Sequence, residues 1–333
     1  MSTITDVARA ASVSVATVSR VINGAGNVTE ATARRVREAI NRLEYRPNVW
    51  GQSLRSQKSS MLLVLVPNIT NPYYAPIISG VEDVVRANGY NIRLCMTDRQ
   101  PERRRQYIRL LYNGQAAGAI AMDVIMNAPL SVEAAQRAPL VQCCEYCEDE
   151  NISHVSIDNV DAARQCVFHL LKLGHGDIGL VGSTNHFIST RQRTEGYEDA
   201  LHRSGVSLRE DYIALADENY SFDSGVKAAG ALLDLPRRPT ALFCISDVLA
   251  LGAVRAAEER GLRVPEDLTV VGFDDVEYAA MFRPNLTTVR QPCYELGRAA
   301  ASLLLDQMAG GEAGQHIYLP YTFIERDSSA PRR

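Results

Sequence analysis

The residues with the clearest chemical purpose lie near the N-terminus, in TITDVARAASVSVATVSRVIN (residues 3–23). The apolar spacing predicts two short helices joined by a tight turn at residues 12–14. Thr5 could cap the first helix and Ser14 the second, because a hydroxyl before a helix can accept a hydrogen bond from its first amides. The face of the second helix opposite its apolar residues carries short or polar side chains and one arginine, namely Val15, Ala16, Thr17, Ser19, Arg20 and Asn23.

Such a face suits the major groove of DNA. Small side chains let the helix backbone approach the base edges, and Arg20 can bond a guanine. The alternative is a two-helix piece of a small bundle. The charge distribution favours DNA, because residues 1–60 hold nine Arg and Lys against four Asp and Glu, whereas the whole chain has a net charge of −4. A basic segment on an acidic body is typical of proteins that bind nucleic acid.

A third helix and a linker follow. The third helix is predicted over about residues 30–43, with Thr29 as its cap. Residues 44–60, EYRPNVWGQSLRSQKSS, are mostly polar, and 48–54 could form two helical turns. Gly51 disfavours a helix there by roughly 0.8–1.0 kcal/mol relative to Ala. The alternative is a linker without regular structure.

Length and composition indicate a soluble globular protein of two or three domains. The chain has 333 residues, of which 46% are hydrophobic and 22% charged. No apolar run is long enough for a membrane span and no signal peptide precedes the first helix. We therefore expect the protein in the cytoplasm, without membrane contact. Its seven cysteines should be reduced there.

From residue 61 the pattern changes to short buried strands that alternate with helices. Two such series predict two doubly wound lobes, with a ligand in the crevice beyond the carboxyl ends of the strands. No strand is followed by a GxGxxG or Walker loop, so no nucleotide cofactor is expected. No nucleophile–base or metal-ligand set stands out either, so neither catalysis nor a metal site is expected. The strands are expected within 61–67, 90–96, 118–123, 139–144 and 154–159, and then within 177–182, 240–247 and 268–275.

The sequence VSVATVSRVIN, followed by YRPN at 45–48 and by Leu54, resembles the DNA-binding head of the lactose/galactose repressor family. The resemblance implies a homodimer on a pseudo-palindromic operator of double-stranded DNA. The linker would fold there into a hinge helix whose Leu54 wedges into the minor groove. Two residues depart from the family, Ser12 where Gly is usual and Gly51 where Ala is usual. The residues expected to meet DNA are Thr5, Ser14, Val15, Ala16, Thr17, Ser19, Arg20, Asn23, Asn27, Tyr45, Asn48, Gly51 and Leu54.

The body resembles the periplasmic sugar-binding fold that this family fuses to its head, and most closely the family's cytidine and purine repressors. The resemblance rests on VPNITNPYYAPIISGVE, HVSIDN, PTALFCISDVLALGA, GLRVPEDLTVVGFDD and LTTVRQPCYELGRAAASLLLDQM. The expected fold is therefore an all-α helix-turn-helix head plus an α/β periplasmic-binding-protein-like core of two doubly wound lobes. The implied boundaries are 1–46 for the DNA-binding domain, 47–60 for the hinge and 61–333 for the effector-binding and dimerisation core, with lobes at about 61–160 plus 291–320 and 161–290 plus 321–333.

The same resemblance and the strand ends together place an effector pocket between the lobes. Tyr73 and Tyr74 follow the first strand, and Asp274 closes LTVVGFDD. Arg193 and Tyr220 fall where the family has its ligand-clamping arginine and its stacking aromatic residue. Either early tyrosine could instead be a core residue, and an aspartate at a strand end could be a helix cap. The candidates, which suit the faces and polar edge of a sugar or base ring, are Tyr73, Tyr74, Glu145, Ser189, Arg193, Tyr220, Ser246, Asp247, Asp274 and Gln291.

Two further stretches have open interpretations. QCCEYCE (142–148) admits a metal or thiol sensor built on the cysteine cluster 143–147. The simpler interpretation is that these small apolar residues line the pocket while Glu145 supplies a polar contact. The charged run at 102–106 starts a helix and is expected to be a solvated face.

These features predict a sequence-specific DNA-binding transcriptional regulator, most simply a repressor, whose operator affinity is set by a small-molecule effector, a sugar or a nucleoside. The effector would close the two lobes, shift the relative position of the N-terminal lobes, and so permit or forbid pairing of the hinge helices. The alternatives are a ligand-binding protein without regulatory coupling and a regulator that responds through the cysteine cluster. The sequence does not decide between a sugar and a nucleoside, or between induction and co-repression.

Overall fold

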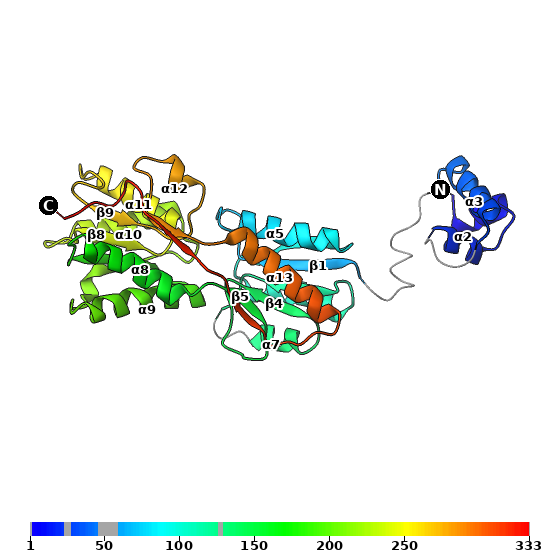
Figure 1. Ribbon diagram of the computed structural model, residues 1–333, viewed down its shortest axis with the longest axis horizontal. Coiled ribbons are helices and arrows are strands. Elements are labelled where there is room, and N and C mark those ends of the chain that lie inside the picture. The colour runs from blue at the N-terminus through cyan, green and yellow to red at the C-terminus, as the bar shows by residue number, and fades with distance from the viewer. Residues whose placement is uncertain (1, 23–27, 46–58, 126–128, 333) are drawn as a thin grey trace. The chain divides into compact units, whose positions relative to one another are not determined.

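The computed structural model describes residues 2–22, 28–45, 59–125 and 129–332. The chain divides into two compact units, residues 1–59 and residues 60–333, and each is described by itself (Figure 1). We call the first unit the head and the second the core. Within the described ranges, no helix has both the length and the apolar character needed to cross a membrane.

Three short helices form the head around a small apolar centre. They are α1 (Ile4–Ala10), α2 (Val15–Ile22) and α3 (Glu30–Arg42). Val7, Val18 and Val36, one from each helix, are fully buried against one another. Ser12, in the turn between α1 and α2, has a φ of 54°, which is the left-handed region that favours glycine. The predicted helix-turn-helix is confirmed.

The first helix is capped by Thr3, so the prediction that Thr5 caps it is wrong. The Thr3 hydroxyl accepts a hydrogen bond from Asp6 N at 3.3 Å, and Thr3 N donates to Asp6 Oδ2 at 2.9 Å. This reciprocal pair is a capping box, which needs an acceptor side chain three residues after the cap, and Asp6 supplies it. Thr5 therefore lies inside the first turn with an exposed side chain. Thr29 precedes α3 as predicted, but its side chain makes no capping hydrogen bond.

Two parallel sheets form the core (Figure 1). The first has six strands in the order β11-β5-β4-β3-β1-β2, and the second has four in the order β7-β6-β8-β9. Two further strands, β10 (Thr288–Arg290) and β12 (Thr322–Ile324), pair with each other in antiparallel fashion. They belong to two of the segments in which the chain passes from one sheet to the other. The expected α/β core of two doubly wound halves is confirmed. The sheet strands are β1 (Met61–Val66), β2 (Asn91–Met96), β3 (Gly118–Ala121), β4 (Leu140–Cys143), β5 (His154–Ser156), β6 (Ile178–Ser183), β7 (Ile213–Ala216), β8 (Ala241–Cys244), β9 (Thr269–Val271) and β11 (His316–Tyr318).

Helices from distant parts of the chain pack on the sheets. Figure 1 shows α13 beside α5, although more than 200 residues separate them in sequence. Gly297 permits this approach, because a Cβ there would lie 2.0 Å from the carbonyl oxygen of Ile77. The six-stranded half is thus completed by the C-terminal part of the chain. The core helices are α5 (Tyr74–Ala87), α6 (Pro101–Tyr112), α7 (Pro129–Ala135), α8 (Asn159–Lys172), α9 (Ile188–Arg203), a 3-10 turn (Glu210–Tyr212), α10 (Phe222–Leu233), α11 (Asp247–Glu258), α12 (Tyr278–Met281) and α13 (Cys293–Met308).

The charged run 102–106 is only partly solvated, which corrects the expectation for it. Arg104 is 8% exposed, and its Nε donates to Asp123 Oδ2 at 2.9 Å, just beyond the end of β3. Ile108 and Leu111 lie four and seven residues further along α6 and are also buried. The helix therefore turns one face to the sheet, and Arg104 falls on that face because of the helical period.

Candidate DNA-reading face and effector site

The face of α2 that the sequence predicts to read DNA is open to solvent. The helix begins where predicted, because Ser14 Oγ accepts a hydrogen bond from Thr17 N at 3.1 Å. Arg20 is exposed, and within the described ranges no carboxylate forms an ion pair with it. An unpaired arginine among short side chains can reach a base edge. Of the other predicted readers in this unit, Thr5 and Ala16 are exposed and Val15, Thr17 and Ser19 are half-buried.

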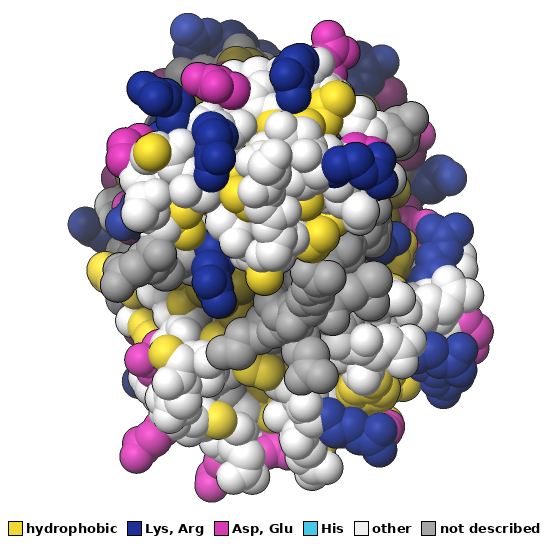
Figure 2. Space-filling view, turned by 90° about the vertical axis from the view of Figure 1, so that its right-hand side faces the viewer, with side chains coloured by type: hydrophobic (Ala, Val, Ile, Leu, Met, Phe, Trp, Pro, Cys, Tyr) yellow, Lys and Arg dark blue, Asp and Glu magenta, His cyan; other side chains and the backbone are white. Residues whose placement is uncertain are grey.

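The remaining predicted DNA contacts lie in the sequence between α2 and α3 or after α3. Tyr45 is half-buried and packs against the apolar centre of the head. On the face shown in Figure 2, Lys and Arg side chains are scattered singly rather than gathered in one patch. Contacts to DNA phosphates carry no sequence information, so sequence reading would depend on side chains that reach base edges, such as Arg20. Asn23, Asn27, Asn48, Gly51 and Leu54 lie outside the described residues.

Arg193 lies at the centre of the predicted effector pocket. It is on α9, is only 5% exposed, and donates from Nε to Asn159 Oδ1 at 3.0 Å. Its Nη1 donates to Ile245 O at 2.6 Å and to Asp274 Oδ1 at 3.2 Å. Gln291 Nε2 donates to the same oxygen of Asp274 at 2.8 Å. Burial raises the pKa of Asp274 to about 6, although the arginine and the amide both oppose this rise.

The three candidate tyrosines are all buried at this cleft. Tyr73 OH donates to Gln291 Oε1 at 3.1 Å, and its ring meets that of Tyr74 edge-on with 5.4 Å between centroids. The hydroxyl of Tyr220 lies 2.5 Å from Thr190 Oγ1. Tyr220 has a φ of 53°, a left-handed backbone that is costly for a tyrosine and is often found at ligand sites. Burial raises the pKa of each phenol, so all three are neutral hydrogen-bonding groups.

Glu145 and Ser189 are brought together from opposite halves of the core. Glu145 follows β4, and Ser189 is in the first turn of α9. Ser189 Oγ is 2.5 Å from Glu145 Oε1, and Ser189 N donates to Oε2 at 3.3 Å. Burial raises the pKa of Glu145 to about 7. The two candidates thus contact each other across the cleft.

Ser246 and Asp247 lie at the predicted strand end, but the structure gives them supporting contacts. Ser246 Oγ accepts from Leu249 N at 3.3 Å and caps α11. Asp247 accepts from Thr288 Oγ1 at 2.6 Å and from Val276 N at 2.9 Å. Asp247 thus connects α11 to the segments that carry Asp274 and Gln291. It neither caps the helix nor lines the cavity described below.

Two residues of the cleft, Asn159 and Thr190, are not among those predicted from the sequence. Asn159 bonds the Nε of Arg193, and Thr190 bonds the hydroxyl of Tyr220. The signals were weak but present. Asn159 ends HVSIDN at the start of a helix, and Thr190 lies three residues before Arg193, on the same side of α9.

A cavity of about 560 Å³ opens beside this network. Its lining includes Tyr73, Asp274 and Gln291 from the candidate set, together with Cys293 and Tyr294 at the start of α13. The volume is in the range that holds a drug-sized ligand. A small molecule in this cavity can therefore meet these three candidates, whereas the other seven, Arg193 among them, do not line it.

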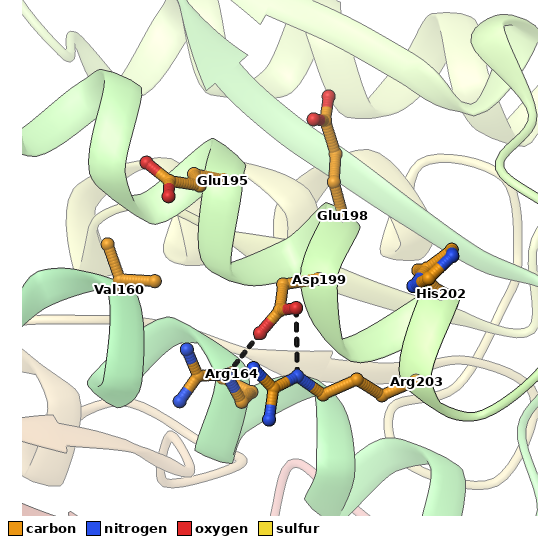
Figure 3. Close-up of a pocket in the computed structure, with 7 residues that line it drawn as sticks. All are labelled: Val160, Arg164, Glu195, Glu198, Asp199, His202 and Arg203. Carbon is orange, nitrogen blue, oxygen red and sulfur yellow. Dashed lines mark hydrogen bonds and ion pairs between the residues drawn. The ribbon is translucent and has the colours of Figure 1, made fainter.

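A second hollow, of about 360 Å³, lies on the outer surface of α8 and α9 (Figure 3). Its central Asp199 accepts from Arg164 Nε at 2.5 Å and from Arg203 Nε at 2.8 Å. These charges are already paired with one another. None of the predicted effector-binding residues lines this hollow, so it is not a candidate effector site.

The cysteine cluster has the character of a buried structural turn. Cys143, Cys144 and Cys147 are all at most 5% exposed, and Cys147 N donates to Gln142 Oε1 at 3.0 Å. A hydrogen bond with Cys144 and burial raise the pKa of the Cys143 thiol, which keeps it protonated and a poor nucleophile. In the parts of the chain that the structure describes, no three His, Cys, Asp or Glu side chains are grouped to hold a metal ion. The geometry gives no support to a metal sensor.

Comparison with known proteins assigns a family to each part of the chain. Residues 3–48 match bacterial regulatory proteins of the lacI family, and residues 167–329 match the periplasmic binding protein-like domain. The HTH-type transcriptional repressor CytR of Escherichia coli (strain K12) is 38% identical over 313 residues, which is 94% of this chain and 91% of that protein. The family resemblance predicted from the sequence is confirmed.

Solved structures extend the likeness to the whole fold. The lac repressor dimer bound to operator and the anti-inducer ONPF matches with a TM-score of 0.89 at 28% identity, covering 99% of both chains. A LacI family transcriptional regulator from Enterococcus faecium with bound ribose matches with a TM-score of 0.72 at 29% identity, covering 82% of this chain and 100% of that one. The similarity thus spans both head and core.

Proposed function

Because this chain belongs to the lacI family of bacterial transcriptional regulators, we propose that it represses transcription by placing α2 in the major groove of an operator, under the control of a small molecule bound in the core. The observation that carries the DNA-binding part is the open face of α2, with Arg20 exposed and unpaired by any carboxylate among the described residues. Arg20 would bond a guanine, and Val15 and Ala16 would contact bases through apolar surface. The protein acts as a homodimer, so two heads would meet the two half-sites of a pseudo-palindrome.

The division of labour along the chain follows from this function. We assign residues 1–46 to DNA binding, 47–60 to a hinge that orders on DNA, and 61–333 to the effector and the dimer. The two halves of the core would be about 61–160 with 291–320, and 161–290 with 321–333. Strand β11 supports this division, because it pairs with β5 in the first sheet.

The effector is a sugar or a nucleoside that occupies the cleft of Arg193. Tyr73, Tyr74 and Tyr220 offer ring faces, while Arg193 and Asp274 offer a donor and an acceptor for adjacent hydroxyl groups. The ribose-bound relative supports a pentose-containing ligand. The protein works in the cytoplasm, where operators are, and is not an enzyme. In support of this, the family that the chain matches consists of transcriptional regulators.

Binding-site selection from random duplexes tests the proposed reading of DNA. The wild-type protein is expected to enrich a pseudo-palindromic sequence with one guanine in each half-site that depends on Arg20. Arg20→Ala should cost about 1–3 kcal/mol per half-site and relax the preference at that base pair. Arg298→Ala, in the core, is the matched control and should select the wild-type sequence. An unchanged consensus with Arg20→Ala would reduce Arg20 to a phosphate contact.

A further inference from the structure

Arg99, which is not among the residues predicted from the sequence, lies at the effector cleft. It follows β2 in the six-stranded half of the core, and its guanidinium lies over the ring of Phe187 in the other half, 5.2 Å from the ring centroid. We propose that Arg99 binds an acidic group of the effector, so that the ligand is a sugar or nucleoside that carries a phosphate or a carboxylate. The proposal names the ligand class of the effector site and rests on the function proposed above.

The charge of Arg99 is not balanced by the residues that the structure describes. Among them no carboxylate forms an ion pair with it, and its side chain bonds only the neutral amide oxygen of Asn219. Asp98 pairs instead with Arg103, and the carboxylate of Asp217 accepts from Asn219 N at 3.0 Å. The Nε of Arg99 is buried and has no hydrogen-bond partner within the described ranges. A buried donor without an acceptor costs free energy, and an oxyanion on a ligand would supply the acceptor.

The turn after β2 holds Arg99 in a fixed position. Asp98 and Arg99 have φ values of 46° and 56°, so two consecutive residues with side chains adopt the left-handed region. This backbone is costly for residues other than glycine and often occurs at ligand sites. Thr97 N donates to Val66 O and Asp98 N donates to Pro67 O, both at 2.9 Å, which ties the turn to the end of β1. A cation held in this way loses little freedom when it binds a ligand.

The start of α9 adds positive potential beside Arg99. Phe187, on which the guanidinium lies, directly precedes α9 and forms no side-chain cap. The first amides of a helix carry a partial positive charge that attracts anions. The carboxyl group of Glu145 accepts from Ser189 N at 3.3 Å, but burial raises its pKa to about 7. Near neutral pH this group therefore brings much less than a full negative charge, and an acidic ligand can approach.

Two neutral phenols of the cleft lie close to Arg99. Burial raises the pKa of Tyr74, and the charge of Arg99 opposes this rise, so the two side chains are neighbours. Tyr220 follows Asn219 in the chain, and burial also raises the pKa of its phenol. Both hydroxyls keep their protons and can donate to an oxyanion, which accepts several hydrogen bonds at once. A neutral hydroxyl group of a ligand in the same place would leave the charge of Arg99 unbalanced.

Matched ligand pairs, compared by calorimetric titration of the full-length protein, test the proposal. The pairs are ribose and ribose 5-phosphate, glucose and glucose 6-phosphate, glucose and glucuronate, and adenosine and its 5′-monophosphate. The acidic member of at least one pair should bind about 10- to 100-fold more tightly than the neutral member, because it gains hydrogen bonds between charged groups. The phosphate and carboxylate pairs distinguish the two sources of the charge. Equal affinity within every pair would overturn the proposal.

Variants show whether Arg99 carries this preference. Arg99→Met should bring the affinity for the acidic member down to that of the neutral member and leave the neutral member unaffected. Arg105→Met removes an exposed arginine from α6 and is the matched control, so it should keep the preference. An equal loss of both members in Arg99→Met would make Arg99 a structural residue, and an unchanged preference would assign the charge to another group. Either result would overturn the proposal.

Inorganic phosphate is a probe that does not depend on the sugar or base. At fixed ionic strength it should raise the melting temperature of wild type and of Arg105→Met, but not that of Arg99→Met. An equal effect on all three proteins would contradict an anion site at Arg99. These experiments contain no DNA. A neutral sugar bound equally well by wild type and Arg99→Met would overturn this inference and leave the effector site and operator binding proposed above in place.

Discussion

Replacing Arg193 by Met should destabilise the core far more than an ordinary surface substitution would. The guanidinium is buried, stacks 3.8 Å from the ring centroid of Phe273, and is the only cation that pairs with Asp274 among the described residues. Removing one partner of a buried ion pair costs about 3–5 kcal/mol, because the other charge stays in a medium of low polarity. Asp274 can escape this penalty by taking up a proton. The loss should therefore be largest at pH 8 and smaller at pH 5.

Urea unfolding followed by circular dichroism measures the free energy of unfolding of the core, and hence the loss of stability in the variant. The matched control is Arg298→Met, because its ion pair with Glu295 spans 3.5 Å and both side chains are about half exposed or more. That variant should lose less than about 1 kcal/mol. The double variant with Arg193→Met and Asp274→Asn should recover part of the lost stability, because it contains no unpaired buried carboxylate. A cost below about 1 kcal/mol for Arg193→Met, with no pH dependence, would refute the reasoning.

Three further predictions concern stability. Thr3→Ala should cost the head about 0.5–2 kcal/mol, measured by thermal unfolding, whereas Thr5→Ala should stay within about 0.5 kcal/mol; the reverse order would contradict the capping box. Gly297→Ala should cost about 1–3 kcal/mol or more, because its Cβ would meet Ile77 O at 2.0 Å, whereas Gly176→Ala meets nothing within 4 Å and should be tolerated. Burial lowers the pKa of His154 from 6.5 to about 4, so neutral His154 stabilises the core above pH 6.5 and this contribution is lost as the pH falls towards 4. The urea midpoint of wild type should drop over that range, and His154→Gln should flatten the drop.

The parts of the fold that sequence could predict are those with a strong local pattern. The buried run of β1 and the alternation of buried strands with helices follow from apolar periodicity, and both are confirmed. The head could be predicted equally well, except for the cap of its first helix, because Thr3 and Thr5 are both of a residue type that caps helices. The bond from Asp6 decides between them, and it becomes visible only when the helix start is known.

Contacts between side chains that are far apart in the chain could not be predicted from the sequence. No local pattern says that Arg104, in a run of charges, turns inward to Asp123. Nor does the sequence show that Glu145 and Ser189, 44 residues apart, hold each other across the cleft. The sequence predicts Glu145 and Ser189 only as ligand contacts. The structure adds that residues predicted as ligand contacts can form hydrogen bonds with one another.

Operator binding in the presence and absence of an effector tests the central proposal most directly. A thermal-shift screen over pentoses, hexoses, nucleosides and purines should reveal a ligand that stabilises the core by about 2.7 kcal/mol at 100 times its dissociation constant. The same ligand should change the affinity for the selected operator by about 5- to 150-fold, and by much less for a random duplex. A ligand that stabilises the core and leaves operator affinity unchanged would make this a binding protein without regulatory coupling, and would contradict the account.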